Sequence, residues 1–366
     1  PPPTNTGPRI HAWCADFETH ITRGEAAAEA AFALKQQGLM PDLICAHSGW
    51  GESLFLKDVW PGIKLLSLFE SYFRPDDGFI NFDPEFPQGR APKMPMLMRT
   101  KNAATLLSLT AADRGISATE FQKSLFPQEY HPSISVCHEG IDTSAICPDD
   151  HARINLPDGV SLTKQDEVIT FVNRELEPLR GYHCFMRALP EILRLRPKAR
   201  VLIVGGIGSG LGYGWRPPAG ATWKQVYLDE VAERLDASRV YFLGTQPREV
   251  LTKILQVSSV HVYLTYPHVL SWSCLEAMSC GALLVGSKTA PVTEVVEHEK
   301  NGLLVDFFSR DELVSAVCRV FDDPDRMRFL REEGRKTVVS RFDLKSVCLP
   351  RQLEIATAVA EGRAVF

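Results

Sequence analysis

Long apolar runs are missing from this 366-residue sequence, and none approaches the roughly eighteen residues that a membrane span needs. The net charge is also small, because 40 lysines and arginines against 45 aspartates and glutamates give −5 at pH 7. Such a balance gives no general attraction to nucleic acid or to anionic lipid. The nine cysteines include no Cys-x-x-Cys pair, so we expect reduced thiols in a cytoplasmic protein. These features predict no nucleic-acid partner and at most peripheral contact with a membrane.

Two glycine-rich stretches lack what a nucleotide-binding loop requires. In VLIVGGIGSGLGYG the glycines alternate, and each G-x-G frame puts a larger residue at the third glycine position: Leu211, Tyr213 or Trp215. In GALLVGSKT, Ser287 stands where a phosphate loop needs lysine. The first absence disfavours a nicotinamide oxidoreductase, and the second excludes a phosphate loop.

One acidic pair, Asp323 and Asp325, superficially resembles a metal site. The pair lies in FDDPDRMRFL beside Pro324, where acids and proline are typical of the start of a helix. We therefore expect a structural role for the pair and no bound metal.

Strands and helices alternate twice along the chain, which is long enough for two domains. Alternation of this kind predicts parallel sheets with helices on their faces. We expect an α/β fold of two doubly wound, Rossmann-like domains, at 1–150 and 151–342, facing across a cleft. A helix at 343–366 is expected to pack back toward the first domain. The strands are predicted at 42–47, 63–69, 133–138, 167–173, 199–206, 239–244, 259–267, 282–286 and 301–306. Helices are predicted from about 99 to 109 and near 310–322 and 324–339, and the spacing Ser117-x-x-Glu120 predicts the start of another. Residues 143–165 are expected to form a polar linker that contains proline.

The segment 266–306 carries the strongest functional signal. Ser273-x-x-Glu276 has the spacing of a capping box, which predicts a helix from about Ser273 to Gly281 with Glu276 in its first turn. The amides of such a helix end bind phosphate, and a carboxylate beside them can accept hydrogen bonds from sugar hydroxyls. The pattern therefore indicates a nucleotide-sugar site, and the plainer interpretation is that Glu276 serves only as the N3 member of the capping box.

LEAMSCGALLVGSKTAPVTEVVEHEKNGLLVD resembles the donor-site segment of the retaining glycosyltransferases of family 4, which have the GT-B fold. The resemblance implies that Glu276 holds the nucleotide ribose, and that Glu294 faces the diphosphate or the sugar. The family often has a second Glu at the position that His268 occupies here. The donor-binding residues implied in this way are Gly205, Gly206, His268, Ser273, Leu275, Glu276 and Glu294.

A second segment, VNRELEPLRGYHCFMRALPEI, places Arg174 just past a predicted strand and Arg180 just before a helix. Two fixed guanidinium groups near a strand end can clamp a diphosphate, although two solvated arginines are an equal alternative. The stretch resembles the family's Gly-Arg-x4-Lys-Gly segment, with Asn173 for Gly and Arg180 for Lys. The resemblance implies that both arginines neutralise the leaving nucleoside diphosphate.

In the first domain, His47 lies at the predicted carboxyl end of a strand, where parallel sheets bind their ligands. A loop histidine is the plainer interpretation, but the resemblance implies that His47 approaches the transferred sugar and its phosphate. Trp50, Glu52, Glu70 and Tyr72 are candidates for contact with the acceptor, and ordinary packing is the alternative for each.

The resemblance implies a metal-independent retaining transfer from a UDP- or GDP-linked sugar, without a further cofactor. The acceptor could be a saccharide, a lipid-linked compound or a small molecule. A nucleotide-sugar-binding or regulatory module without transfer activity is the alternative. The family begins with a strand, a Gly-rich turn and a helix, for which this chain shows only PPPTNTGPR. We therefore expect a first domain without its first strand–helix unit, which an N-terminal segment or a second chain would complete.

Overall fold

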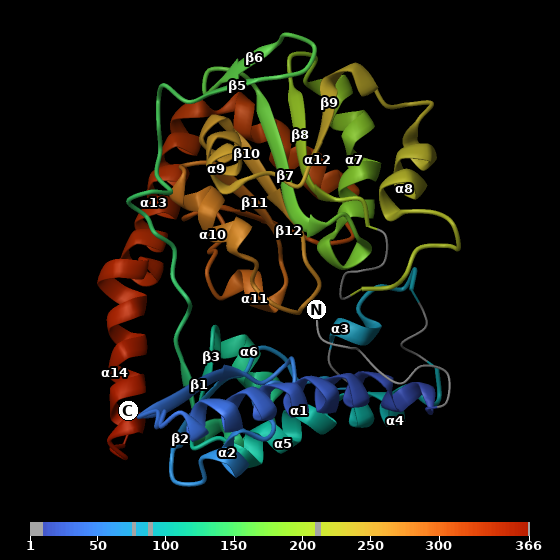
Figure 1. Ribbon diagram of the computed structural model, residues 1–366. Coiled ribbons are helices and arrows are strands. Elements are labelled where there is room, and N and C mark those ends of the chain that lie inside the picture. The colour runs from blue at the N-terminus through green and yellow to red at the C-terminus, as the bar shows by residue number, and fades with distance from the viewer. Residues whose placement is uncertain (1–9, 75–77, 87–90, 209–213, 365–366) are drawn as a thin grey trace. The chain divides into compact units, whose positions relative to one another are not determined.

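The computed structural model describes residues 10–74, 78–86, 91–208 and 214–364 (Figure 1). The chain forms two compact units, one of Pro1–Glu139 with Cys348–Phe366 and one of Gly140–Val347. The sequence-based boundaries, at 150/151 and 342/343, lie within about eleven residues of these crossings. Both units have parallel sheets of α/β character, in line with the predicted fold class. Among the described residues, no helix is both long enough and apolar enough to span a bilayer.

The first unit contains a four-stranded parallel sheet in the order β1-β2-β3-β4. Its strands are β1 (Leu43–His47), β2 (Lys64–Leu68), β3 (Arg114–Ser117) and β4 (Ile134–Val136). Its α-helices are α1 (Ala15–Gln36), α2 (Leu56–Val59), α3 (Gly78–Asn81), α4 (Met94–Lys101), α5 (Ala103–Ala111), α6 (Glu120–Leu125) and α14 (Leu349–Ala360). Strand β3 has no counterpart among the strands predicted from the sequence.

Adjacent residues of β2 show that helices cover both faces of this sheet. Leu65 packs into a cluster with Ala31 of α1 and Val59 of α2. Leu66, which points to the opposite face, packs against Ile355 of α14. The last helix of the chain therefore completes the core of the first unit.

Two sequence predictions in this unit were wrong in detail. The helix expected from about residue 99 to 109 is two helices, and Asn102 lies between them. The Asn102 side chain accepts a hydrogen bond from the Phe73 amide and donates one to the Phe73 carbonyl. Ser117, expected to open a helix, ends β3, and Thr119 provides the cap by accepting from the Gln122 amide. Ser117 therefore pairs with the neighbouring strand β4 and does not cap a helix.

The second unit contains a six-stranded parallel sheet in the order β12-β11-β10-β7-β8-β9. Its strands are β7 (Val168–Glu175), β8 (Arg200–Gly206), β9 (Val240–Gly244), β10 (Val260–Tyr263), β11 (Leu283–Ser287) and β12 (Leu303–Val305). Its α-helices are α7 (Tyr182–Leu195), α8 (Trp223–Val231), α9 (Arg248–Val257), α10 (Trp272–Ser279), α11 (Ala290–Thr293), α12 (Arg310–Asp322) and α13 (Pro324–Phe342). Residues 143–165, expected to form a polar linker, contain the antiparallel pair β5 (Arg153–Asn155) and β6 (Ser161–Thr163).

The strand order creates a topological switch point between β7 and β10. From β7 the chain adds β8 and then β9 on one side, and it returns to the other side of β7 with β10, β11 and β12. Connections that diverge in this way leave a crevice at the carboxyl ends of the two central strands, which is where doubly wound sheets bind ligands. The strand order therefore places the expected ligand site at the loops that follow β7 and β10.

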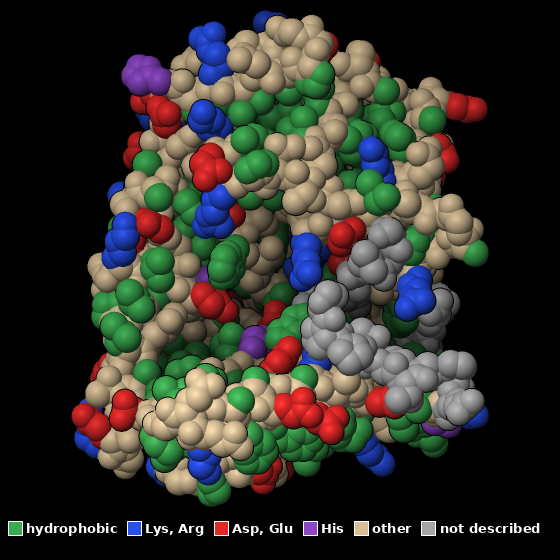
Figure 2. All heavy atoms as spheres, in the orientation of Figure 1, with side chains coloured by type: hydrophobic (Ala, Val, Ile, Leu, Met, Phe, Trp, Pro, Cys, Tyr) green, Lys and Arg blue, Asp and Glu red, His purple; other side chains and the backbone are tan. Residues whose placement is uncertain are grey.

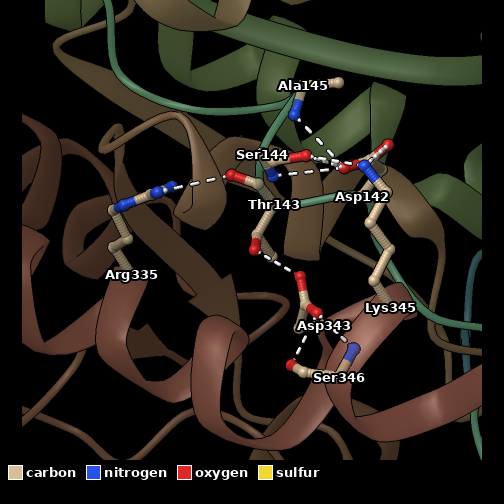
Figure 3. Close-up of polar contacts among 8 residues, drawn as sticks. All are labelled: Asp142, Thr143, Ser144, Ala145, Arg335, Asp343, Lys345 and Ser346. Carbon is tan, nitrogen blue, oxygen red and sulfur yellow. Dashed lines mark hydrogen bonds and ion pairs between the residues drawn. The ribbon is translucent and has the colours of Figure 1, made fainter. Parts of the chain in front are cut away.

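A β-bridge and hydrogen bonds join the start of the second unit to its end (Figure 3). Ile141 forms a parallel bridge with Asp343. The Thr143 hydroxyl donates to the Asp343 carboxylate, which also accepts from the amide and hydroxyl of Ser346. These hydrogen bonds, with burial as a weaker opposing effect, lower the pKa of Asp343 to about 2. Two segments some 200 residues apart are thus joined inside the second unit.

Figure 2 shows acidic and basic side chains interspersed with apolar ones on the described part of the face that it presents. This distribution agrees with the small net charge of −5.

Candidate functional site

The loops after β7 and β10 pack tightly against each other at the switch point. The Tyr266 amide donates to the Leu179 carbonyl at 3.0 Å. Gly181 has φ +69°, and a Cβ atom there would lie 2.2 Å from the Cβ of Leu264. Glycine is therefore required at this position, both for its backbone conformation and for the close approach. This packing fixes Arg180, the residue before Gly181, at the crevice.

Arg180 is buried and lies beside the start of α10. Its guanidinium contacts the Tyr263 hydroxyl, which also accepts a hydrogen bond from the Ser271 amide at 2.7 Å. Burial raises the pKa of Tyr263, and Arg180 partly opposes that rise. Nη1 of Arg180 is buried and has no hydrogen-bond partner among the described residues. A buried cation with an unused donor beside a helix start is suited to an anionic ligand.

The predicted capping box at Ser273 and Glu276 was wrong. Ser271 occupies the N-cap position of α10, so Glu276 is the fifth helical residue and lies beyond the first turn. Its side chain is 6% exposed and forms an ion pair with Arg248, whose Nη2 lies 2.9 Å from Oε1. Burial raises the pKa of Glu276, and the Arg248 charge opposes that rise. Because Glu276 does not cap the helix, its costly burial calls for another explanation.

Arg248 is a residue of this site that sequence reasoning missed. It is the first residue of α9, its side chain is 52% exposed, and its guanidinium lies 6.0 Å from the centre of the Trp272 ring. The available signal was a basic residue opening the helix that follows β9, at the same edge of the sheet as the other loops. Its pairing with Glu276 could not be read from sequence, since the two residues belong to different helices.

Gly205 and Gly206 let the end of β8 approach the end of β7. A Cβ atom on Gly205, which has φ +150°, would lie 2.5 Å from the Asn173 carbonyl oxygen. One on Gly206 would lie 2.4 Å from the Glu175 carboxylate, which accepts a hydrogen bond from the Gly208 amide. Both glycines are therefore explained by packing at the site edge. Gly210 and Gly212 lie outside the described residues.

The remaining residues predicted to bind the donor differ in exposure and in the groups that a ligand could contact. Arg174 is exposed, and among the described residues it forms no ion pair with Glu276, which pairs with Arg248 instead. Leu275 is fully buried in the core, so only its backbone is available. The Ser273 hydroxyl is 3.4 Å from that of Ser271.

His268 and Glu294 lie in the loops of the same unit. His268 is buried in the segment between β10 and α10, and its amide donates to the Tyr266 carbonyl. Glu294 is half-buried directly after α11, and its carbonyl accepts from Arg341. Both residues therefore lie in segments that follow strands at the carboxyl edge of the sheet.

The acidic pair near residue 324 has the structural role expected of it. The Asp323 carboxylate caps α13 by accepting from the Arg326 amide, and Asp325 pairs with Arg328 at 3.1 Å. Neither carboxylate belongs to the site at the switch point.

In the first unit, His47 ends β1 and contacts Glu70, which follows β2. Its Nδ1 accepts a hydrogen bond from the Gly49 amide at 3.0 Å, and this leaves Nε2 facing the Glu70 carboxylate at 3.4 Å. The Trp50 ring lies 5.8 Å from the imidazole ring. Three of the predicted residues therefore come together at the carboxyl edge of the first sheet.

The other two predicted acceptor residues lie elsewhere in that unit. Glu52 is exposed in the loop after β1. Tyr72 packs its ring 5.7 Å from that of Phe126 and lines a pocket of about 480 Å³ together with Arg74 and His131. Neither His47 nor Glu70 lines that pocket.

Comparison with protein families matched almost the whole chain. The model described as Glycosyl transferase family 4 group matches residues 1–146, and that described as Glycosyl transferases group 1 matches residues 155–337.

Curated relatives match a shorter stretch. The D-inositol 3-phosphate glycosyltransferase of Segniliparus rotundus is 26% identical over 61% of this chain and 47% of its own length. That of Rhodococcus jostii is 30% identical over 55% of this chain and 42% of its own length. A GDP-mannose-dependent alpha-(1-6)-phosphatidylinositol monomannoside mannosyltransferase of Mycolicibacterium smegmatis is 25% identical over 64% and 60%. The chain thus spans about half the length of the first of these relatives.

Solved structures with the same fold include the sucrose-phosphate synthase of Thermosynechococcus elongatus, with a TM-score of 0.72 and 18% identity. The match covers 98% of this chain and 83% of that one. HepE of Anabaena, in complex with UDP and glucose, has a TM-score of 0.65 and 16% identity over 91% and 83%. At these identities the likeness establishes the fold.

Proposed function

Because this chain belongs to the group 1 glycosyltransferases of family 4, we propose that it transfers a sugar from a nucleoside-diphosphate sugar to an acceptor hydroxyl, with retention of anomeric configuration. The observation that carries the proposal is Arg180. It is buried at the switch point of the second sheet, it adjoins the start of α10, and its Nη1 has no partner among the described residues. A diphosphate would supply the missing acceptor.

The second unit provides a separate group for the nucleoside. Glu276 lies on α10, whose start adjoins Arg180, and its buried carboxylate is poised to accept hydrogen bonds from two ribose hydroxyls. Arg248, which pairs with Glu276 across from α9, would hold that carboxylate ionised until the donor binds. UDP- and GDP-linked sugars share this ribose diphosphate, so both remain candidate donors.

In the proposed reaction the bond between the anomeric carbon and the phosphate oxygen breaks, and its electron pair leaves with the nucleoside diphosphate. The acceptor oxygen bonds to the anomeric carbon on the same face, and its proton passes to the departing phosphate. Negative charge grows on the phosphate during this step, so Arg180 and the amides of α10 would stabilise the transition state more than the ground state. The step uses no metal ion, since these groups provide the electrostatic stabilisation.

One observation favours a second candidate, a binding module without transfer activity. His268 stands where the family often has glutamate, and it is buried between β10 and α10. A module of this kind would bind the nucleotide sugar through Arg180 and Glu276 and leave it intact.

Mass spectrometry of UDP- and GDP-sugars incubated with the protein tests the proposal, because either hydrolysis or transfer releases a nucleoside diphosphate. We expect turnover that falls at least about a hundredfold in Arg180→Gln, since a charge-assisted contact to the transition state is lost. The matched control is Arg187→Gln on α7, which removes an arginine that pairs with Glu230 and should retain turnover. Nucleotide-sugar binding without turnover would support the binding module, and failure to bind any nucleotide sugar would reject both candidates.

A further inference from the structure

The first unit holds an arginine that no predicted motif contains. Arg23, on α1, places its guanidinium carbon 5.9 Å from the centre of the Trp50 ring. Trp50 in turn contacts His47, and His47 contacts Glu70. These four residues, here called the Arg23 cluster, form a continuous set of contacts at the carboxyl ends of β1 and β2.

Glycines fix the Arg23 cluster by bringing α1 against the loop after β1. Gly51 has φ +95°, and a Cβ atom there would lie 2.3 Å from the His20 carbonyl oxygen. A Cβ atom on Gly24 would lie 2.8 Å from the Gly51 carbonyl oxygen. Larger residues at either position would force the helix and the loop apart. Close backbone packing between α1 and the loop after β1 therefore holds Arg23 near the Trp50 ring.

Among the described residues, Arg23 forms no ion pair, and its Nε is buried without a hydrogen-bond partner. Asp16, about two turns earlier on α1, pairs instead with Lys101 at 2.8 Å. A guanidinium that is held against an aromatic ring and keeps free donors is suited to a phosphate group, which it can bind through two parallel hydrogen bonds.

Trp50 offers a surface for the rest of such a ligand. The residue is 40% exposed, although its ring lies near both Arg23 and His47. An indole face provides apolar contact for the C–H groups of a sugar ring. The imidazole of His47 and the carboxylate of Glu70 provide hydrogen-bonding groups for its hydroxyls. The cluster thus combines a phosphate-binding group, a ring-binding face and hydroxyl-binding groups.

We propose that the Arg23 cluster is the acceptor subsite, and that the acceptor is a phosphorylated sugar or cyclic polyol whose phosphate binds Arg23 and whose ring lies on Trp50. The proposal rests on the proposed function, since it names the acceptor class of that reaction. A soluble sugar phosphate and the phosphorylated sugar headgroup of a lipid share this chemistry.

Titration calorimetry tests the subsite without any turnover. The probes are myo-inositol 1-phosphate, myo-inositol and inorganic phosphate, each with the full chain, and vesicles of phosphatidylcholine with and without phosphatidylinositol test the lipid source. We expect myo-inositol 1-phosphate to bind at least about tenfold more tightly than either of the other two soluble probes, because only it contacts both Arg23 and Trp50. Arg23→Gln should remove most of this preference, and Arg23→Lys should restore part of it. Arg99→Gln, at an exposed arginine of α4, is the matched control.

Equal binding of myo-inositol and its phosphate would overturn the proposal, as would binding of inorganic phosphate as tight as that of the sugar phosphate. An effect of Arg23→Gln no larger than that of Arg99→Gln would also overturn it. Binding of UDP and GDP, measured on the same samples, keeps the two proposals apart. Nucleotide binding without the expected preference rejects only the subsite, and the preference without nucleotide binding rejects the donor site. Tighter binding to the phosphatidylinositol vesicles than to the soluble probe would identify the lipid as the source.

Discussion

Nη2 of Arg248 lies 2.9 Å from the buried Oε1 of Glu276, and this ion pair joins the first residue of one helix to the second turn of another. The two side chains differ in exposure, at 52% for Arg248 and 6% for Glu276. Desolvation of the Glu276 carboxylate therefore costs more free energy than desolvation of Arg248. The ion pair with this exposed arginine offsets only part of that cost. Such an arrangement is typical of a group retained for binding and not for stability.

We predict that Glu276→Gln stabilises the protein and weakens donor binding. Burial raises the pKa of Glu276 above its usual 4.5, so the folded state holds this proton more tightly than the unfolded state does. The charged form therefore costs stability as the pH rises through that pKa, and glutamine removes the cost. We expect a gain of about 1 kcal/mol in the free energy of unfolding at pH 7, and at least tenfold weaker binding of UDP or GDP.

Urea unfolding at pH 4 and pH 7, with calorimetry of nucleotide binding, checks this prediction. The gain should shrink at pH 4, where glutamate approaches its neutral form. Glu249→Gln, at an exposed glutamate of α9, makes the same charge change and should leave both quantities nearly unaltered. A loss of stability in Glu276→Gln at pH 7 would show that the carboxylate is structural.

A methyl group at residue 181 should disrupt the packing that positions Arg180. Gly181 has φ +69°, and the new Cβ would lie 2.2 Å from that of Leu264, so we expect Gly181→Ala to cost about 3 kcal/mol. Gly220 has φ +77° with no atom within 4 Å of a new Cβ, so Gly220→Ala should cost only about 1 kcal/mol of backbone strain. Chemical denaturation of the two variants measures the difference. Equal losses would mean that strain alone, and not the approach to Leu264, decides the cost.

His261 should make the protein sensitive to acid. Full burial lowers the pKa of His261 to about 3 from an ordinary 6.5, and its Nδ1 lies 2.9 Å from the Thr170 hydroxyl. Between these values the unfolded state binds a proton that the folded state does not, so stability falls with decreasing pH by up to about 1.4 kcal/mol per unit. His261→Gln should flatten the pH dependence by that amount between pH 6 and pH 5. His298→Gln, at a half-exposed histidine, is the control, and parallel curves for wild type and His261→Gln would contradict the prediction.

The contact between Thr143 and Asp343 should couple the two ends of the second unit (Figure 3). Asp343→Ala should cost about 3 kcal/mol, because it leaves the hydroxyls of Thr143 and Ser346 without their acceptor. Thr143→Val should cost about 1 kcal/mol, and the double variant should cost about 1 kcal/mol less than the sum. Lys345→Ala removes an exposed ion pair to Asp142 and should cost at most about 0.5 kcal/mol. Strict additivity of the Thr143 and Asp343 variants would contradict the coupling.

Local sequence predicted most elements of the second unit because its strands are continuous apolar runs with clear ends. The runs at β7, β8, β10 and β11 were all expected, as were the helices that open at Pro324 and near Arg310. Predictions failed where a polar residue had two possible partners. Ser117 and Ser273 both carry the capping spacing, but Ser117 donates its hydroxyl to the Phe69 carbonyl, and Ser271 occupies the N-cap position in place of Ser273. Side-chain spacing alone does not decide between a local and a distant partner.

The sequence by itself indicated Arg180 and Glu276 as candidates to bind a diphosphate and a ribose, since both stand in segments that resemble the donor site of the family. Only the tertiary structure decided which side chain each of these charged groups contacts. Arg180 contacts Tyr263, Glu276 pairs with Arg248, and Arg23 lies over Trp50, and each pair joins segments that strand order and packing bring together. The physical reason is that burial and long-range contact set the free energy of a charge, and neither quantity is a property of the local sequence.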